Sequence, residues 1–233
     1  MADAGAPPSQ TLSRGIRILE TLADAREPLT IDDVAARLDV HRSIAYRLLR
    51  TLEHHGLVVR DANGHVALGA RMAALAAGVA HDLQAEALPE LTAVANDLGM
   101  TCFLAVLDHD ECVTLVSVEP RHAVAPVAQR PGARHPITRG APGKAILSQL
   151  PPARWPASAP EVAEAVAEVA ARGYATSHDE VIPSLRSVAV PLAVQGRGPA
   201  ALAVVHVSHD VSAERVAARL QRSAEAVRSA LGE

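Results

Sequence analysis

Apolar residues recur every three or four positions in three segments near the start of the chain, 13–25, 30–38 and 42–55. This spacing places the apolar side chains on one face of a helix, so the pattern predicts three amphipathic helices. Thr30 is a suitable N-cap for the second helix. Asp39 occupies the turn before the third helix, where the left-handed backbone is expected, and Asp tolerates that conformation better than most residues.

Two short apolar runs follow the third helix, at 57–60 and 65–68, and the pair Asn63-Gly64 lies between them. Asn-Gly is a strong hairpin signal because both residues tolerate the positive φ of a type I′ turn. Three helices followed by a hairpin is the order of a winged helix-turn-helix. We therefore predict such a domain over residues 1–69.

The pattern changes in the second part of the chain. Residues 70–98 are predicted to be a helical linker with a bend at 84–89, and residues 99–233 to form a separate domain. Strands are predicted at 101–107, 112–118, 188–194 and 200–207, and helices at 142–150, 161–172 and 212–231. Strand pairs interleaved with helices indicate an α+β fold with an antiparallel sheet.

The composition fits a globular protein without defining its partners. Hydrophobic residues make up 49% of the chain and aromatic residues 2%, so the core must consist mostly of Ala, Val and Leu. The net charge of −4 means that any contact with nucleic acid must come from a local basic patch. The longest apolar stretch, 72–80, is too short for a bilayer of about 30 Å. No secretory signal pattern is present, so we expect a cytoplasmic protein with no membrane contact.

The third helix carries such a basic patch. Between His41 and Arg60 there are four arginines and one acidic residue. Side chains four positions apart lie on one stripe of a helix, and a stripe of this kind fits the major groove of DNA. The simpler alternative is a solvated helix face. The predicted DNA-binding residues are Arg42, Ser43, Tyr46, Arg47 and Arg50 on the helix, and Arg60, Asn63 and His65 on the hairpin.

The chain resembles the IclR family of bacterial regulators along nearly its whole length. The resemblance lies in the segments 13–20, 42–49, 67–69, 143–145, 173–175, 179–180 and 186–191. It implies that the first domain binds operator DNA and that the second, with a GAF-like fold, binds a small effector. It also implies a dimer or tetramer.

The resemblance also implies which residues line the effector pocket. These are Val124, Val127, Ala141, Pro142, Ser177, Leu185, Ser187, Val204 and His206. Members that respond to glyoxylate or pyruvate are more polar at the positions of Ser177 and Val204. We therefore expect a small organic acid that is larger or more apolar than those two. For His206 the alternative is a buried histidine satisfied by the backbone.

The segment 140–144 has a glycine-rich sequence, but Thr138 and Ala145 stand where a phosphate-binding loop needs glycine and a hydroxyl residue. Two interpretations stay open for this helix start: an anion bound by free N–H groups, or close packing. No catalytic residue, cofactor or metal is predicted, because the spacing of His206 and His209 is a weak metal signal.

These observations predict a transcriptional regulator, and we expect a repressor. Two protomers would place their third helices in successive major grooves of a pseudo-palindromic operator. A small molecule would then control operator affinity through the linker. The alternative is a metabolite-binding module or metabolic enzyme that uses its helical N-terminus only for dimerisation.

Overall fold

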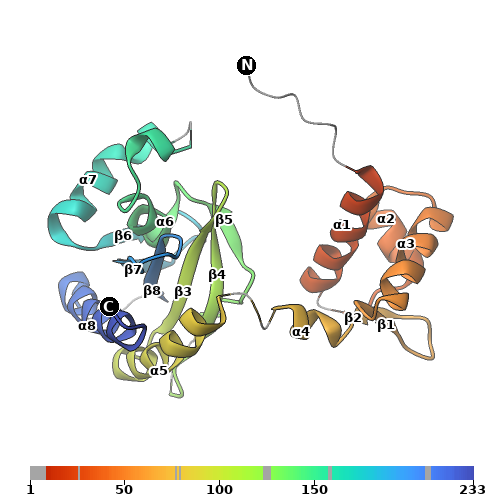
Figure 1. Cartoon of the computed structure of the whole chain (residues 1–233), viewed down its shortest axis with the longest axis horizontal. Helices are drawn as coiled ribbons and strands as arrows, with labels where there is room; N and C mark the ends of the chain where they lie inside the picture. Colours follow the sequence, from red (N-terminus) through yellow and green to blue (C-terminus); the bar gives the residue numbers. More distant parts are fainter. Residues whose placement is uncertain are drawn as a thin grey trace. The chain divides into compact units, whose positions relative to one another are not determined.

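The computed structural model describes residues 9–25, 27–76, 78, 80–122, 127–156, 159–207 and 211–233. The chain divides into two compact units, Met1–Val79 and Ala80–Glu233 (Figure 1). Each unit has its own hydrophobic core.

The first unit contains four helices and a two-stranded sheet within its described residues. They are α1 (Gln10–Asp24), α2 (Ile31–Leu38), α3 (Arg42–His54), β1 (Val58–Arg60), β2 (Val66–Leu68) and α4 (Arg71–Ala76). The core is formed by residues such as Ile18 of α1, Val34 of α2 and Leu49 of α3, all fully buried. This arrangement confirms the predicted order of three helices followed by an antiparallel hairpin.

The ends of α2 explain how the chain reaches α3. The hydroxyl of Thr30 accepts a hydrogen bond from the Asp33 N–H, and the Asp33 carboxylate accepts one from the Thr30 N–H. This reciprocal cap satisfies two N–H groups at the helix start. Asp39 ends α2 with φ 54°, which confirms the predicted left-handed turn. The turn is tight, so α3 begins only three residues later.

The hairpin is present, but the predicted type I′ turn is wrong. In the turn only Gly64 has a positive φ, of 85°, while Asn63 does not. The Gly64 N–H donates to the Asp61 carbonyl at 3.1 Å, and the Asp61 carboxylate accepts from the N–H groups of Asn63 and His65. These bonds to Asp61 favour a type I turn followed by a left-handed glycine, which is also common in hairpins.

The second unit is a six-stranded antiparallel sheet with helices on both faces (Figure 1). The strand order is β5-β4-β3-β8-β7-β6. The strands are β3 (Thr101–Asp108), β4 (Glu111–Val118), β5 (Arg134–Pro136), β6 (Ala175–His178), β7 (Arg186–Leu192) and β8 (Ala200–His206). The helices are α5 (His81–Leu98), α6 (Gly140–Leu147), α7 (Ala163–Arg172) and α8 (Ala213–Ala230), with 3₁₀ turns η1 (Pro152–Arg154) and η2 (Ala159–Val162).

Side chains alternate between the two faces of this sheet. Residues such as Leu202 and Val204 pack with α5 and α8, whereas Ala203 and Val205 pack with α6 and α7. The two faces therefore have separate cores, as the two-residue period of a strand requires. The face that α6 covers is the one that carries the pocket described below.

Three details of the second unit differ from the predictions. Helix α5 continues through Pro89, so the bend predicted at 84–89 does not interrupt the helix. Burial of Leu83, Ala87 and Leu91 on one face outweighs the hydrogen bond that proline removes. Strands β5 and β6 were not predicted, because they are short and partly polar. Helix α6 begins at Gly140, two residues before the predicted start.

Candidate functional site

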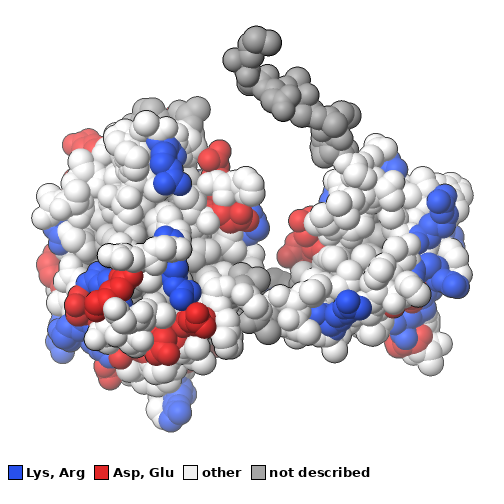
Figure 2. Space-filling view, in the orientation of Figure 1, with Lys and Arg blue, Asp and Glu red and all other residues white. Residues whose placement is uncertain are grey.

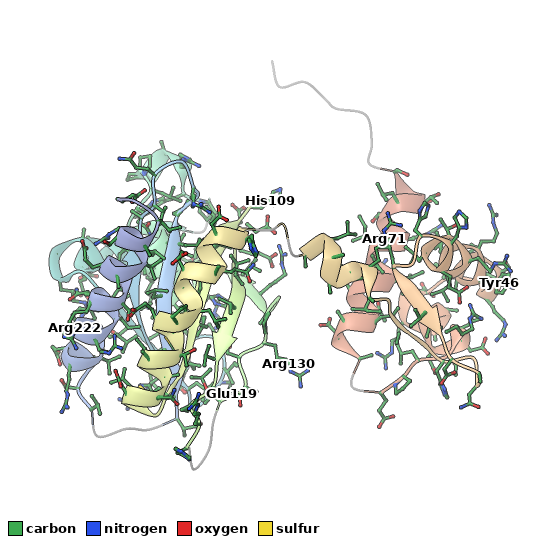
Figure 3. All side chains as sticks on the ribbon, turned by 60° about the horizontal axis from the view of Figure 1, so that its bottom comes forward. Tyr46, Arg71, His109, Glu119, Arg130 and Arg222 are labelled. Atoms are coloured by element: carbon green, nitrogen blue, oxygen red, sulfur yellow. The ribbon has the colours of Figure 1, made fainter. Side chains whose placement is uncertain are left out.

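The exposed face of α3 carries the predicted basic stripe. Arg42, Tyr46 and Arg50 are spaced four apart, and the Arg50 guanidinium lies 6.0 Å from the centroid of the Tyr46 ring. Tyr46 projects outward from the unit (Figure 3) and is 43% exposed. Ala45 and Leu49 lie on the opposite, buried side. The stripe is therefore held in solvent by a buried apolar face, as predicted.

Arginine side chains gather over α3 (Figure 2), but they have different partners. Arg42 forms an ion pair with Asp32 at the start of α2, and both side chains stay more than half exposed. Arg47 is exposed and no ion pair with it is found among the described residues. Ser43 contacts the imidazole of His41, which also caps α3 by accepting from the Ser43 N–H. This capping role of His41 was not predicted from the sequence.

The hairpin residues are placed less uniformly. Nε of Arg60 donates to Glu53 at 2.8 Å, and the two side chains are only 24% and 23% exposed. Arg60 therefore joins the hairpin to α3 rather than extending into solvent. Asn63 is exposed at the tip, and His65 is half-exposed with Nδ1 3.2 Å from the Asp61 carboxylate.

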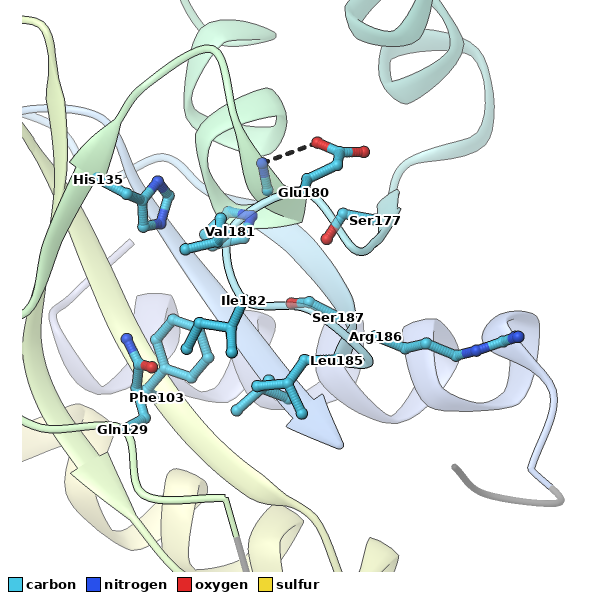
Figure 4. A pocket seen from close by; sticks show the side chains of 13 residues that line it. Phe103, Gln129, His135, Ser177, Glu180, Val181, Ile182, Leu185, Arg186 and Ser187 are labelled. Carbon is cyan, nitrogen blue, oxygen red and sulfur yellow. Dashed lines mark hydrogen bonds between the residues drawn. The ribbon is translucent and has the colours of Figure 1, made fainter. Parts of the chain in front are cut away.

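A pocket of about 40 Å³ lies in the second unit between the sheet, the start of α6 and the loop 179–185 (Figure 4). Its walls are apolar, with a few polar groups. The lining residues are Phe103, Gln129, His135, Gly140, Pro142, Ser177, Glu180, Val181, Ile182, Leu185, Arg186, Ser187 and Val205. Such a mixture of apolar walls and a few polar groups is typical of small-molecule sites.

The loop 179–185 forms one wall of the pocket and is closed on itself. The Asp179 N–H donates to the Leu185 carbonyl at 3.0 Å, and the Ser184 N–H donates to the Asp179 carboxylate. Val181 and Ile182 at its tip are 44% and 45% exposed. Asp179 and Ser184 have positive φ, so the chain leaves the strand direction after His178. Glu180 therefore lies in this loop and not on a strand.

Glu180 joins the loop to α6. Its carboxylate accepts from the Gly140 N–H at 2.9 Å and from Lys144 Nζ at 2.5 Å, and Lys144 also donates to the Thr176 carbonyl at 3.3 Å. Lys144 is only 8% exposed. The protein's own carboxylate thus occupies the anion position at this helix start.

Close packing also shapes the start of α6. A Cβ at Gly143 would lie 2.1 Å from the Ile137 carbonyl oxygen, far inside van der Waals contact. Glycine is therefore required here so that the helix can approach Ile137. Of the two interpretations left open by the sequence, packing is the one that the described contacts support, with Glu180 as an internal cap.

Four of the predicted effector residues line the pocket, namely Pro142, Ser177, Leu185 and Ser187. The other five do not line it. Ala141 is fully buried and Val127 partly buried in the core on the α6 face, and Val204 is buried on the opposite face of the sheet. His206 lines a second groove, and Val124 lies outside the described residues. Val204 thus cannot contribute to this pocket. Its neighbour Val205 does so.

Several lining residues were not predicted from the sequence, including Phe103, Gln129, His135, Val181 and Ile182. Phe103 is the single phenylalanine of the chain, and Val181-Ile182 is an apolar pair among polar loop residues. These two features were the available signals. His135 and Gln129 gave no signal, because His135 is placed by the pairing of β5 with β4 and Gln129 by its hydrogen bond to Thr114 of β4.

The second groove, of about 520 Å³, lies at the β6–β8 edge of the sheet beside α8 and shares Ser177, Glu180, Arg186 and Ser187 with the first pocket. His178, Arg186 and His206 stand side by side on three neighbouring strands and line it. No group of three or more metal-binding side chains occurs among the described residues, which do not include His209. None of the helices in the described ranges has the length and apolar character needed to cross a membrane.

The comparison with known proteins covers both units. The profile of the IclR helix-turn-helix domain matches residues 11–62, and that of the C-terminal region of bacterial IclR transcriptional regulators matches residues 76–230. The glycerol operon regulatory protein of Streptomyces coelicolor is 30% identical over 211 residues, covering 82% of this chain and 81% of that protein.

Two solved structures are similar in fold and sequence. An IclR transcriptional regulator from Alicyclobacillus acidocaldarius has a TM-score of 0.82 and 28% identity, covering 97% of this chain and 100% of the other. An IclR homologue from Microbacterium hydrocarbonoxydans, in complex with 4-hydroxybenzoate, has a TM-score of 0.81 and 26% identity, covering 95% and 98%. With a helix-turn-helix unit, an effector-type unit and these relatives, the chain belongs to the IclR family of bacterial DNA-binding transcriptional regulators.

Proposed function

We propose that α3 is the recognition helix and that the protein acts as a repressor of its target genes. The observation that carries this proposal is the exposed stripe of Arg42, Tyr46 and Arg50, with Arg47 beside it, on a helix whose other face is buried. An exposed arginine can contact guanine edges or phosphates in the major groove. Asn63 and His65 at the hairpin are proposed to contact the DNA backbone beside it.

Arg47 and Arg42 are expected to contribute differently. Arg47 has no ion pair among the described residues to give up, whereas Arg42 must exchange Asp32 for DNA. Arg47→Ala should therefore weaken binding to DNA from the gene's own upstream region by about tenfold or more. Arg42→Ala should weaken the same binding less. Fluorescence anisotropy over a range of salt concentrations would measure this loss.

Loss of a phosphate contact should also lower the salt dependence by about one unit of slope. Arg222→Ala is the matched control, because Arg222 is exposed on α8 in the other unit. If Arg47→Ala bound as tightly as the wild type, the assignment of the recognition helix would be wrong. If the wild type itself did not bind, the alternative of a metabolite-binding module or enzyme would be preferred.

We also infer that the protein binds as a homo-oligomer to a pseudo-palindromic operator. One recognition helix reads one half-site, and two half-sites lie about 34–36 Å apart on successive major grooves. Sedimentation of the protein with a full operator and with a single half-site tests this. Equal affinity for both DNA fragments would contradict it.

The pocket beneath the loop 179–185 is proposed as the effector site. Its apolar walls and its position against the start of α6 support this, and so does the relative that was solved with 4-hydroxybenzoate. An organic acid with an apolar body stays our predicted effector. Calorimetry with benzoate, 4-hydroxybenzoate and neutral aromatic compounds tests it, and tight binding by neutral compounds alone would contradict the acid.

We take the protein not to be an enzyme. Burial raises the pKa of the Cys112 thiol to about 12 and that of Cys102 further still, so neither supplies a thiolate near neutral pH. His178 and Asp179 are exposed and 3.5 Å apart, and Glu180 is engaged with Lys144. These features give no support to a catalytic site. Turnover of a metabolite by the purified protein would contradict this view.

A further inference from the structure

The groove beside α8 contains a row of nitrogen-bearing side chains. Arg186 pairs with His178 of β6 on one side and with His206 of β8 on the other. Directly opposed residues of antiparallel strands place their side chains on the same face, with Cβ atoms about 4.5–5.5 Å apart. All three residues line the groove. Arg186, the permanent cation, therefore lies in the middle of the row.

Arg186 forms no ion pair within the part of the chain that the structure describes. The carboxylates that follow β6 are engaged elsewhere. Glu180 accepts from Lys144 and from a main-chain N–H. Asp179 accepts from a main-chain N–H and lies 3.5 Å from Nε2 of His178. The described carboxylates thus leave the charge of Arg186 to an anion from solution.

The start of α8 forms another wall of the groove, where Ala213 and Val216 line it. The side chain of Arg186 extends toward this first turn (Figure 4). Ser212 caps the helix by accepting from the Arg215 N–H, which leaves earlier N–H groups of the turn without a main-chain acceptor. A guanidinium and the positive end of a helix dipole therefore face the same space. This arrangement is unfavourable unless an anion lies between them.

The acidic residue in the first turn of α8 does not supply that anion. The carboxylate of Glu214 accepts from the Tyr174 hydroxyl at 3.2 Å. Glu214 is not among the described residues that line the groove. The anion position between Arg186 and α8 is therefore open to a ligand.

The remainder of the groove suits a ligand larger than a bare ion. Its volume of about 520 Å³ is in the range of small-molecule sites. Val188 and Val216 are buried and give it an apolar floor. The hydroxyl of Thr176 accepts from Arg172 at 3.3 Å and keeps its hydrogen for a further acceptor. The groove thus offers polar and apolar contacts beside the anion position.

We propose that this groove binds the phosphate group of a small metabolite between Arg186 and the start of α8. A phosphate monoester carries a charge of about −1.5 to −2 at pH 7 and presents three oxygens. It can therefore contact a guanidinium and helix N–H groups at the same time. The site is separate from the proposed effector pocket, because Ala213 and Val216 line this groove only.

Ribose 5-phosphate and ribose are matched probes, because they differ only in the phosphate group. NMR titration of the ¹⁵N-labelled full-length protein at constant ionic strength measures their binding. Ribose 5-phosphate should shift the Ala213 amide, ribose should not, and inorganic phosphate should bind more weakly than ribose 5-phosphate. Arg186→Gln should weaken binding of ribose 5-phosphate by about tenfold or more, because a hydrogen bond between charged groups is lost. Arg222→Gln is the control, since it removes the same charge from an exposed position of α8.

Ala213→Glu provides a second variant that should keep the fold. A carboxylate in the first turn of a helix is favourable, so the melting temperature should not fall. The same carboxylate would occupy the anion position and repel phosphate, so binding should weaken by about tenfold or more. Ala218→Glu is the control, because it adds the same charge at an exposed position further along α8.

Four results would overturn the proposal. They are no shift with either phosphate compound at millimolar concentration, equal binding of ribose and ribose 5-phosphate, unchanged binding in both Arg186→Gln and Ala213→Glu, and an equal loss in the two control variants. Equal affinity for inorganic phosphate and ribose 5-phosphate would contradict a metabolite as the source of the phosphate group.

Discussion

Lys144→Met tests whether the link between the loop 179–185 and α6 contributes to stability. Methionine keeps most of the apolar stem of lysine and removes the ammonium group, so little cavity is created. The substitution removes two hydrogen bonds, at 2.5 Å to Glu180 and at 3.3 Å to the Thr176 carbonyl. It also leaves the Glu180 carboxylate with the Gly140 N–H as its remaining described partner.

The magnitude follows from burial. Breaking a fully buried ion pair by removing one partner costs about 3–5 kcal/mol. The side chain of Glu180 is 30% exposed, so water can solvate the carboxylate left behind. We therefore expect a smaller loss of about 2 kcal/mol in the free energy of unfolding of the second unit, close to the value of a hydrogen bond to a charged group.

Urea unfolding followed by tryptophan fluorescence measures this loss. Trp155 is the single tryptophan of the chain, and its indole N–H donates to the Leu150 carbonyl in the second unit. Glu180→Gln and the double variant complete a thermodynamic cycle, in which we expect a coupling of about 1 kcal/mol or more. A loss below about 0.5 kcal/mol with additive single effects would refute the reasoning.

Two further predictions concern the start of α6 and the turn of the hairpin. Gly143→Ala should destabilise the second unit by more than about 1 kcal/mol, because its Cβ would lie 2.1 Å from the Ile137 carbonyl oxygen. Gly198→Ala is the control and should be nearly neutral, because the space around Gly198 is open. Thermal unfolding measures both variants. Hydrogen bonds to the Asp61 carboxylate, chiefly from the His65 N–H, lower the pKa of Asp61. The charged form is thus favoured in the fold, so hydrogen-exchange protection of the His65 amide should persist above the ordinary pKa of 3.8 and fall as the pH drops below it; constant protection there would contradict this.

Local signals in the sequence predicted the first unit well. The cap at Thr30 and the left-handed turn at Asp39 depend on residues within one or two turns of the chain. The hairpin was located correctly, but its turn type depended on the Asp61 carboxylate, which an Asn-Gly pair alone does not reveal. At Pro89 the local pattern predicted an interruption of the helix, but packing of α5 on the sheet keeps the helix continuous.

The pocket was less predictable because it is built from non-local contacts. Val204 was chosen in place of Val205, and a shift of one residue along a strand moves the side chain to the other face of the sheet. His135 reaches the pocket through the pairing of β5 with β4, and Gln129 through a hydrogen bond to Thr114; the sequence encodes neither contact locally. Four of the nine effector residues taken from the family resemblance line this pocket. They lie at the start of α6, on β6, at the end of the loop 179–185 and on β7.

The carboxylate at the start of α6 has a consequence for loop movement. Because Glu180 belongs to the loop, lifting the loop would withdraw a negative charge from a helix start and from the Lys144 ammonium group together. Both groups attract anions when uncovered. Dissolved phosphate or carboxylate would then compensate for the lost partner, so these anions would reduce the free-energy cost of lifting the loop.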